Sequence, residues 1–499
     1  MPLIERDADR LSSFLEDAAH FPGGHAAGVA APASEAEVID VLRSAAAVLP
    51  IGAQSSLTGG ATPMGEVVLS TSKLNRIVAI GTDAVRVQAG VPLTALDAAL
   101  AAEGKYYPPA PTFMGAFVGG TIATNAAGAA TFRHGVTRDW VTALRVVLAS
   151  GEILEIVRGG TLASTRVPVP TYRVPAVAKC SAGYFAAPGM DLIDVFIGSE
   201  GTLGVITEAT LRVVPERPAL VLAFVAIDEV GAALRLVADL RRDALPLCLS
   251  GIEHMDARCL SLLREDGVDR RAGVSLPDRA RIALLMTFEL PPTLTAEDAF
   301  DQIGRATDVA MAHSPLARLC RTLEVAGVFD RVEIAVPGER ARAAQLLAVR
   351  EAVPEAVNAR IAAAQRTIDP RISKTAADMI VPFDRLGELM ALYDGEFRAR
   401  GLDAAIWGHI SDGNLHPNVL PRSFADVESG REAILAFGRS VLRMGGSPLA
   451  EHGVGRNSIK RQLLREMYGD DGIEEMRGVK RALDPDWKLA PGVLFTPTR

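Results

Sequence analysis

The spacing of apolar and polar residues predicts short strands alternating with helices over the first hundred residues. Ser34 followed by Glu37 is a capping-box pattern, and the apolar spacing from there through Val48 predicts a helix. A short β-rich stretch at residues 67–70 predicts a strand. The Ala/Leu-rich stretch 92–104 starts with proline and ends with glycine, which predicts a second helix.

After Pro215 the pattern changes, and its order predicts a second α+β unit. Its predicted elements are strand 219–227, helix 230–241, strand 281–290, helix 296–312, strand 332–336 and an Ala-rich helix over 340–364 that is broken at Pro354. Residues 156–188 are rich in Pro, Ala and Gly with weak periodicity, which predicts a long excursion before regularity resumes at Asp191.

Length and composition predict a multidomain globular protein. A chain of 499 residues is too long for one ordinary core, so we expect two or three structural units. Its 49% hydrophobic and 22% charged residues are typical of a compact chain. The net charge of −8, with no Lys/Arg-rich run, argues against a nucleic-acid partner.

Features of targeting and of metal clusters are missing from the sequence. The first residues, MPLIERDADRLSSF, carry both charges and lack the apolar core of a secretory signal, and no apolar run reaches membrane-spanning length. The cysteines are widely spread without a C-x-x-C pair, which excludes iron–sulfur and structural-zinc motifs: Cys180, Cys248, Cys259 and Cys320. We therefore expect a cytoplasmic protein, with peripheral membrane association as the alternative, whose redox chemistry would need a cofactor.

Three glycine-rich segments can direct backbone N–H groups at cofactor phosphates. The first is residues 50–60, the second joins 108–112 to 119–128, and the third is 198–207. None contains a Walker lysine or G-x-G-x-x-G, so neither a P-loop nor a Rossmann fingerprint is present. Taken singly, each segment is also typical of an ordinary tight turn.

Together with their neighbours, these segments resemble FAD-linked oxidases of the vanillyl-alcohol-oxidase superfamily, in the D-lactate, glycolate and D-2-hydroxyglutarate dehydrogenase branch. The likeness is carried by the three segments, by Leu74-Asn75-Arg76-Ile77 and by Arg133-His134-Gly135-Val136-Thr137-Arg138-Asp139. It implies an α+β fold with a PCMH-type FAD-binding domain of two α+β subdomains, a cap domain with an antiparallel sheet, and a C-terminal helical segment. The implied ranges are 1–216, 217–405 and 406–499.

The resemblance implies that the first loop binds the FAD pyrophosphate and that the later two segments follow the ribityl and isoalloxazine parts. Ile51 stands where arginine is common, and the first loop has no histidine for covalent attachment, so we expect non-covalent FAD. The implied FAD-binding residues are Pro50, Gly52, Ala53, Gln54, Ser55, Ser56, Pro111, Thr112, Gly119, Gly120, Thr121, Asn125, Gly128, Glu200, Gly204, Val205 and Ile206.

A polar cluster at residues 407–418, joined by 451–453, contains the candidate metal ligands. Two imidazoles and one carboxylate can form a facial site for a divalent metal, although hydrogen-bonded turn histidines and a solvated acid would give the same spacing. The resemblance implies that His409, His416 and Glu451 bind the metal, with zinc expected and manganese as the alternative. Ser411 stands where glycine is usual.

Further residues are candidates for substrate chemistry. His452 matches the general base of the branch, and its alternative role is to orient Glu451. Arg350 and Lys374 match the residues that bind the substrate carboxylate, although each would otherwise be a solvated charge. Asn414 could donate to substrate or flavin, or be an Asx-turn residue.

These features predict a FAD-dependent dehydrogenase that oxidises a small, D-lactate-like D-2-hydroxy acid with help from a metal. Pro354 stands near a position that carries a hydroxyl in the D-2-hydroxyglutarate enzymes, which argues against that particular substrate. Electrons would leave to a quinone, a cytochrome, an electron-transfer flavoprotein or oxygen, and a homodimer is compatible with the pattern. The alternatives are a flavin oxidase of an aryl or alkyl alcohol and a zinc hydrolase.

Overall fold

The computed structural model describes residues 4–109, 111–160 and 167–496, and the chain divides into two compact units. Unit 1 comprises Met1–Gly128, Gly135–Glu216 and Leu449–Arg499, and unit 2 comprises Ala129–His134 and Arg217–Pro448. The predicted segment 406–499 is thus shared, because the chain passes from unit 2 to unit 1 after Pro448. Part of the excursion 156–188, residues 161–166, lies outside the described residues.

Unit 1 begins with a small parallel sheet beside helix α2 (Glu35–Ser44). Ser34 caps α2 by accepting a hydrogen bond from the Glu37 N–H, as the capping box predicts. The helix ends at Ser44 and not at Val48 as predicted. Val48 instead begins a strand that pairs with Val67. The described strands of this sheet have the order β1 (Gly28–Ala30), β3 (Val67–Ser70) and β2 (Val48–Ile51).

A second, antiparallel sheet completes the two α+β halves predicted for this part of the chain. Its described strands have the order β4 (Ile77–Ile80), β5 (Ala84–Gln88), β8 (Val205–Arg212), β6 (Val141–Val147) and β7 (Ile153–Val157). Besides α2, the described helices of unit 1 before its C-terminal segment are α1 (Ala8–Ser12), α3 (Leu93–Ala102), α4 (Val118–Ala123) and α6 (Leu192–Phe196). Helix α3 follows Pro92, as predicted.

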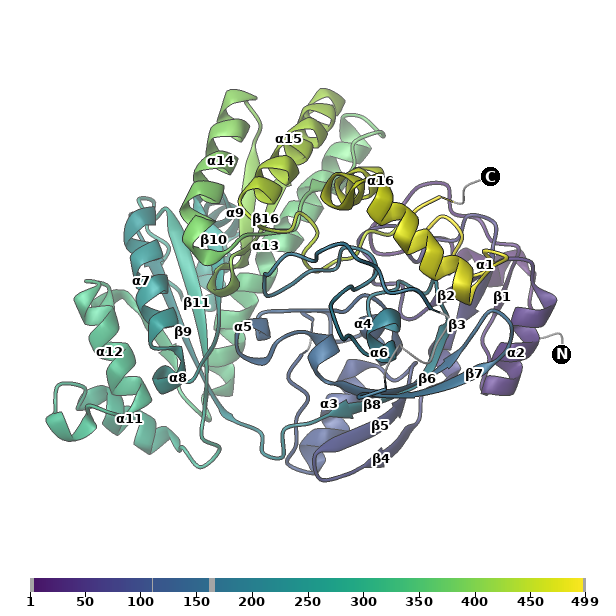
Figure 1. Cartoon of the computed structure of the whole chain (residues 1–499). Coiled ribbons are helices and arrows are strands. Elements are labelled where there is room, and N and C mark those ends of the chain that lie inside the picture. The colour runs from purple at the N-terminus through teal and green to yellow at the C-terminus, as the bar shows by residue number, and fades with distance from the viewer. Residues whose placement is uncertain (1–3, 110, 161–166, 497–499) are drawn as a thin grey trace. The chain divides into compact units, whose positions relative to one another are not determined.

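The C-terminal helix α16 (Ser458–Leu483, yellow in Figure 1) belongs to unit 1 and is kinked at Gly469. Near its end, the buried Lys480 ammonium donates to the Thr202 carbonyl at 2.5 Å and to the Leu489 carbonyl at 2.8 Å. Leu489 also forms an isolated parallel bridge to Val48. The C-terminal segment therefore fastens the third glycine-rich segment to the parallel sheet.

Unit 2 is built on an antiparallel sheet, as expected for the cap. The strand predicted at 219–227 is β9 (Ala219–Ile227), and the one predicted at 281–290 is β11 (Ile282–Leu290). The described strands have the order β12 (Glu333–Ala335), β9, β11, β10 (Leu249–Asp256), β15 (Ala404–His409), β16 (Asn414–Val419) and β13 (Thr375–Ala376), and β14 (Met379–Ile380) also pairs with β16.

The longest helix of unit 2, α13 (Arg340–Thr367), is continuous through Pro354, so the predicted break there is wrong. Its buried face, which includes Val349 and Val353, packs in one core with Phe224 of β9, and this packing outweighs the hydrogen bond that proline removes. The other helices are α5 (Thr131–His134), α7 (Val230–Arg242), α8 (Ala244–Leu247), α9 (Ala257–Glu265), α10 (Val268–Ala272), α11 (Ala296–Gly304), α12 (Pro315–Val325), α14 (Leu386–Ala399) and α15 (Phe424–Arg443). Helix α7 packs against β9 (Figure 1).

Helix α11 is shorter than the predicted range 296–312. It ends at Gly304, and Arg305 then forms ion pairs with Asp301 and Asp308. A separate 3-10 turn follows at Val309–Met311. None of the helices that the structure describes combines the length and the hydrophobicity of a membrane span.

Candidate active site

The three glycine-rich segments of unit 1 line one cavity of about 300 Å³. Of the predicted FAD-binding residues, the structure brings together Pro50, Gly52, Ala53, Gln54, Ser55, Ser56, Pro111, Thr112, Gly119, Gly120, Thr121, Glu200, Gly204, Val205 and Ile206. Asn125 and Gly128 are absent from the lining, and the Asn125 side chain instead accepts a hydrogen bond from the Arg138 N–H at 2.9 Å. Segments far apart in sequence thus form one concave surface.

Two glycines show how closely backbone segments approach around this cavity. A Cβ at Gly119 would lie 2.6 Å from the Ala89 Cβ, so only glycine lets α4 begin against the end of β5. A Cβ at Gly120, one residue later, would meet no atom within 4 Å. Gly119 therefore serves packing, while Gly120 leaves bare backbone at the cavity wall.

Glu200 connects the third glycine-rich segment to the segment that follows His452. Its carboxylate accepts hydrogen bonds from the Val454 and Gly455 N–H groups, each at 2.8 Å. Burial raises the pKa of Glu200 to about 7, although these hydrogen bonds oppose the rise. Gly453 has φ +70°, and a Cβ there would lie 2.9 Å from the Glu200 carboxyl group. Glu200 thus positions the loop that carries the predicted base.

Glu451 and His452 belong to unit 1 and line the same cavity as the glycine-rich segments. The Glu451 carboxylate accepts a hydrogen bond from the Lys179 ammonium at 2.5 Å, and the Lys179 side chain is fully buried. The His452 side chain is 33% exposed, with its Nε2 4.0 Å from the second carboxylate oxygen. Lys179 was not found from the sequence, because it lies in the irregular stretch 156–188 and lysine is almost never fully buried.

In unit 2, the first predicted metal-binding histidine contacts a carboxylate that an arginine also contacts. His409 ends strand β15 and is the cross-strand partner of Glu253 on β10. One Glu253 oxygen lies 3.0 Å from His409 Nδ1, and the other lies 3.1 Å from Arg350 Nε. Burial alone would raise the pKa of Glu253, but Arg350 and His409 lower it to about 2. No motif or pattern in the sequence marked Glu253 as a residue of the site.

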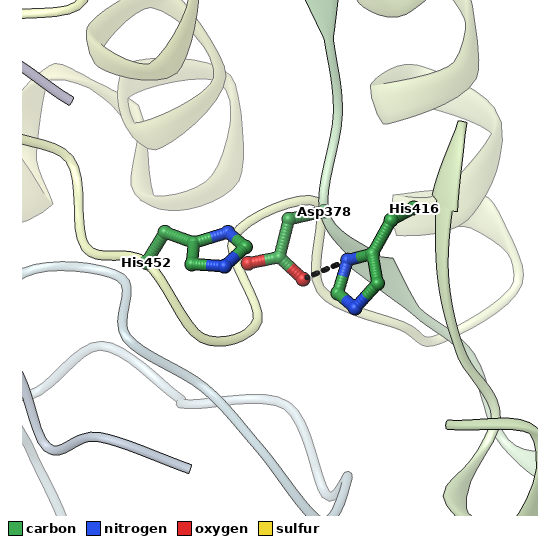
Figure 2. Close-up of side chains that lie close together, drawn as sticks. All are labelled: Asp378, His416 and His452. Atoms are coloured by element: carbon green, nitrogen blue, oxygen red, sulfur yellow. Dashed lines mark ion pairs between the residues drawn. The ribbon is translucent and has the colours of Figure 1, made fainter. Parts of the chain in front are cut away.

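The second histidine has a similar environment, which Figure 2 shows. His416 Nδ1 lies 3.3 Å from an oxygen of the buried Asp378. The same oxygen accepts a hydrogen bond from the Asn414 side-chain amide at 3.0 Å, and that amide also donates to the Met379 carbonyl. The Asn414 amide nitrogen is therefore used within unit 2, and both its contact to substrate or flavin and its Asx-turn role stay predictions.

The turn between the two histidines has its own constraints. Gly413 has φ +86°, and a Cβ there would lie 2.2 Å from the Val381 carbonyl oxygen. Ser411, which replaces the usual glycine, accepts a hydrogen bond from the Ile252 N–H at 3.0 Å, so its hydroxyl fastens the turn to β10. The substitution is compatible with the hairpin.

The two imidazoles of unit 2 suit a shared divalent metal. Their ring centroids lie 5.5 Å apart, and the rings are nearly perpendicular. At His409 the hydrogen-bonded carboxylate favours Nδ1–H and presents Nε2 as the ligand atom, and at His416 a buried carboxylate oxygen lies 3.3 Å from Nδ1. The third predicted ligand, Glu451, belongs to unit 1. Lys374 lies exposed before β13, without a close partner among the contacts found for the described residues.

The Arg133-His134 pair lies in unit 2, whereas the rest of its motif lies in unit 1. His134 Nε2 is 2.6 Å from a Glu289 oxygen, and Arg133 Nε is 3.7 Å from the same oxygen. The other Glu289 oxygen accepts from the Ser250 hydroxyl at 2.7 Å. This part of the motif therefore anchors a short segment on the sheet of unit 2.

Comparison with known proteins places the chain in a family. Residues 26–156 match the FAD binding domain, and residues 217–494 match the family described as FAD linked oxidases, C-terminal domain. The chain is 32% identical to a D-2-hydroxyglutarate dehydrogenase of Xanthomonas citri pv. viticola, over 94% of this chain and 89% of the relative. It is 28% identical to the glycolate oxidase subunit GlcD of Bacillus subtilis (90% and 83% covered) and to a D-lactate dehydrogenase of Anaerostipes hadrus (89% and 83%).

Solved structures support the same fold. An alkyldihydroxyacetonephosphate synthase aligns with a TM-score of 0.63 at 15% identity, covering 98% of this chain and 83% of the synthase. The sequence matches confirm the resemblance carried by the glycine-rich segments. The chain belongs to the family of FAD-linked oxidases.

Proposed function

We propose that the protein oxidises a small D-2-hydroxy acid, of the D-lactate type, to the 2-oxo acid with non-covalently bound FAD. The main support is that His452, the predicted base, lines the same cavity of unit 1 as the predicted FAD-binding segments. Three relatives named for D-2-hydroxyglutarate, glycolate and D-lactate agree with this substrate class.

His452 is the residue that we assign to the proton of the substrate hydroxyl. It is partly exposed, so a substrate can reach it, and an imidazole accepts protons near neutral pH. Lys179 holds Glu451 beside it, and Glu200 fixes the next residues of the loop. Bound FAD would supply the acceptor for the hydrogen on the substrate's second carbon.

Arg350 is our candidate for binding the substrate carboxylate, because its guanidinium provides a planar fork for two oxygens. Glu253 forms an ion pair with it, in which one carboxylate oxygen lies 3.1 Å from Nε. Lys374 is exposed in unit 2 and stays the second predicted contact.

We also propose a divalent metal, zinc or alternatively manganese, that binds His409 and His416, with Glu451 as the third predicted ligand. The carboxylate at Nδ1 of each histidine is the arrangement that metal-binding imidazoles commonly have. Such a metal would lower the pKa of a bound hydroxyl. Dialysis against a chelator should lower turnover, and added zinc or manganese should restore it.

Anaerobic flavin reduction tests the proposed reaction. D-Lactate should bleach the flavin of the reconstituted protein, whereas L-lactate should not. His452→Gln should retain FAD but reduce more slowly, by about 10²-fold or more. His20→Gln is the matched control, because His20 is an exposed histidine of the same unit. Bleaching by the L-isomer alone would contradict the proposal.

The same assay separates the alternatives. An aryl or alkyl alcohol oxidase would be reduced by benzylic or aliphatic alcohols and would ignore the chelator. A zinc hydrolase would cleave esters without flavin, and the match to a FAD binding domain argues against it. Reoxidation with a quinone, a cytochrome, an electron-transfer flavoprotein or oxygen would identify the acceptor. The homodimer and the cytoplasmic location stay predictions, which gel filtration and cell fractionation would test.

A further inference from the structure

Glu253 lies between two residues that the sequence assigned to different tasks. It is 7% exposed on β10, where it is the direct cross-strand partner of His409. Its two oxygens divide between His409 Nδ1 at 3.0 Å and Arg350 Nε at 3.1 Å. The carboxylate therefore bridges a predicted metal ligand and the predicted substrate arginine.

Two backbone elements determine this bridge. The antiparallel pairing of β10 with β15 places Glu253 opposite His409. Arg350 comes from α13, whose adjacent Val349 is fully buried in the core that also contains Met255 of β10. A displacement of the Glu253 carboxylate would consequently change its contacts to both side chains at once.

We propose that Glu253 is a positioning residue that couples metal binding by His409 to substrate binding by Arg350. Its contact at Nδ1 holds the imidazole in the tautomer that offers Nε2 to a metal. Its ion pair at Nε holds the guanidinium through opposite charge, and that guanidinium is our candidate for the substrate carboxylate. This inference rests on the proposed function, and it predicts that a change at Glu253 affects metal affinity and KM together.

Unit 2 offers a matched control for a general loss of a buried carboxylate. Glu289 also contacts one histidine and one arginine, His134 at 2.6 Å and Arg133 at 3.7 Å, and it is similarly buried. None of these three residues is a predicted metal ligand or substrate contact. Glu289→Gln should therefore perturb folding as Glu253→Gln does, without changing zinc affinity.

The experiment compares wild type, Glu253→Gln, Glu253→Asp and Glu289→Gln as FAD-loaded proteins. Zinc dissociation constants come from competition with a chromophoric chelator, and KM and kcat come from steady-state turnover of D-lactate. Glu253→Gln should raise the zinc Kd by about 10- to 100-fold. It should also raise KM about tenfold or more, because a displaced positioning group misaligns the substrate. Flavin content should stay at the wild-type level.

The variants separate failure of this inference from failure of the proposed function. If wild type binds zinc but Glu253→Gln matches Glu289→Gln in both zinc Kd and KM, the inference is wrong. If wild type binds neither zinc nor manganese, the metal part of the proposed function fails together with the His409 half of the inference. If Glu253→Gln does not fold, Glu253→Asp serves as the test variant. It keeps the negative charge but moves the carboxylate back by one methylene group, away from His409 and Arg350. An Asp variant with wild-type Kd and KM would overturn the proposal.

Discussion

Removal of the Lys179 ammonium should destabilise unit 1 strongly. The ammonium lies 2.5 Å from Glu451 Oε1, with side-chain exposures of 0% and 7%. At this distance and an effective dielectric constant of 20, the attraction is about 7 kcal/mol, and desolvation of the two ions offsets several kcal/mol of it. Lys179→Met keeps an apolar stem of similar length but leaves Glu451 buried without its cation, so we expect a loss of about 3–5 kcal/mol.

A double-mutant cycle isolates this pair. Glu451→Gln alone should cost a comparable amount, because it removes the carboxylate charge that the buried ammonium contacts. The double variant Lys179→Met/Glu451→Gln should lose less than the sum of the single losses, by about 3 kcal/mol. The exposed Lys73 of the same unit provides the control, because Lys73→Met should stay within about 0.5 kcal/mol of wild type.

Urea unfolding of the FAD-loaded protein in EDTA, followed by release of flavin fluorescence, reports on unit 1 without bound metal. With a denaturant slope near the upper end of the usual range, Lys179→Met should lower the midpoint by about 1–2 M. A loss below about 1 kcal/mol, or single losses that simply add, would refute the assignment of a buried, coupled ion pair.

Three further predictions follow from the described contacts. Gly453→Ala should weaken FAD retention, because alanine is strained by about 1–2 kcal/mol at a positive φ and its Cβ would strike Glu200. The measurement is the flavin content after gel filtration, and wild-type retention would contradict the close approach. The pKa of Glu200 is raised to about 7 from an ordinary value of 4.5, so the folded protein keeps this proton more strongly than the unfolded chain. The free energy of unfolding of the FAD-free protein should therefore fall by up to about 3 kcal/mol as pH rises from 4.5 to above 7. Urea titrations of Glu200→Gln should show no such pH-dependent loss of stability over that range. An equal loss in the variant would mean that another group causes it. Pro354→Ala should stabilise unit 2 by about 1–3 kcal/mol, because α13 gains a backbone hydrogen bond. The measurement is the unfolding midpoint from Trp407 fluorescence, in protein whose other two tryptophans are replaced (Trp140→Phe/Trp487→Phe). An unchanged midpoint would indicate that the helix already accommodates the proline ring.

Local patterns in the sequence determined many of the elements, and the family resemblance of the glycine-rich segments indicated much of the cavity lining. Strands at 67–70 and 219–227 were predictable because short apolar runs rich in branched residues pair into sheets. Glycine-rich segments were recognisable because close backbone approach, as at Gly119, requires a residue without a side chain. His409, His416 and His452 stood out because they fall in short polar motifs.

Only the tertiary structure decided what surrounds those residues. Glu253 is 156 positions from His409, and Lys179 is 272 positions from Glu451. Periodicity reports which face of an element is buried, but sheet register and packing determine which distant charges meet there. Pro354 illustrates the same limit, because its local preference predicts a break while the packed face of α13 keeps the helix intact. The candidate reactive groups could thus be found from the sequence, whereas the buried charges that hold them depend on the fold.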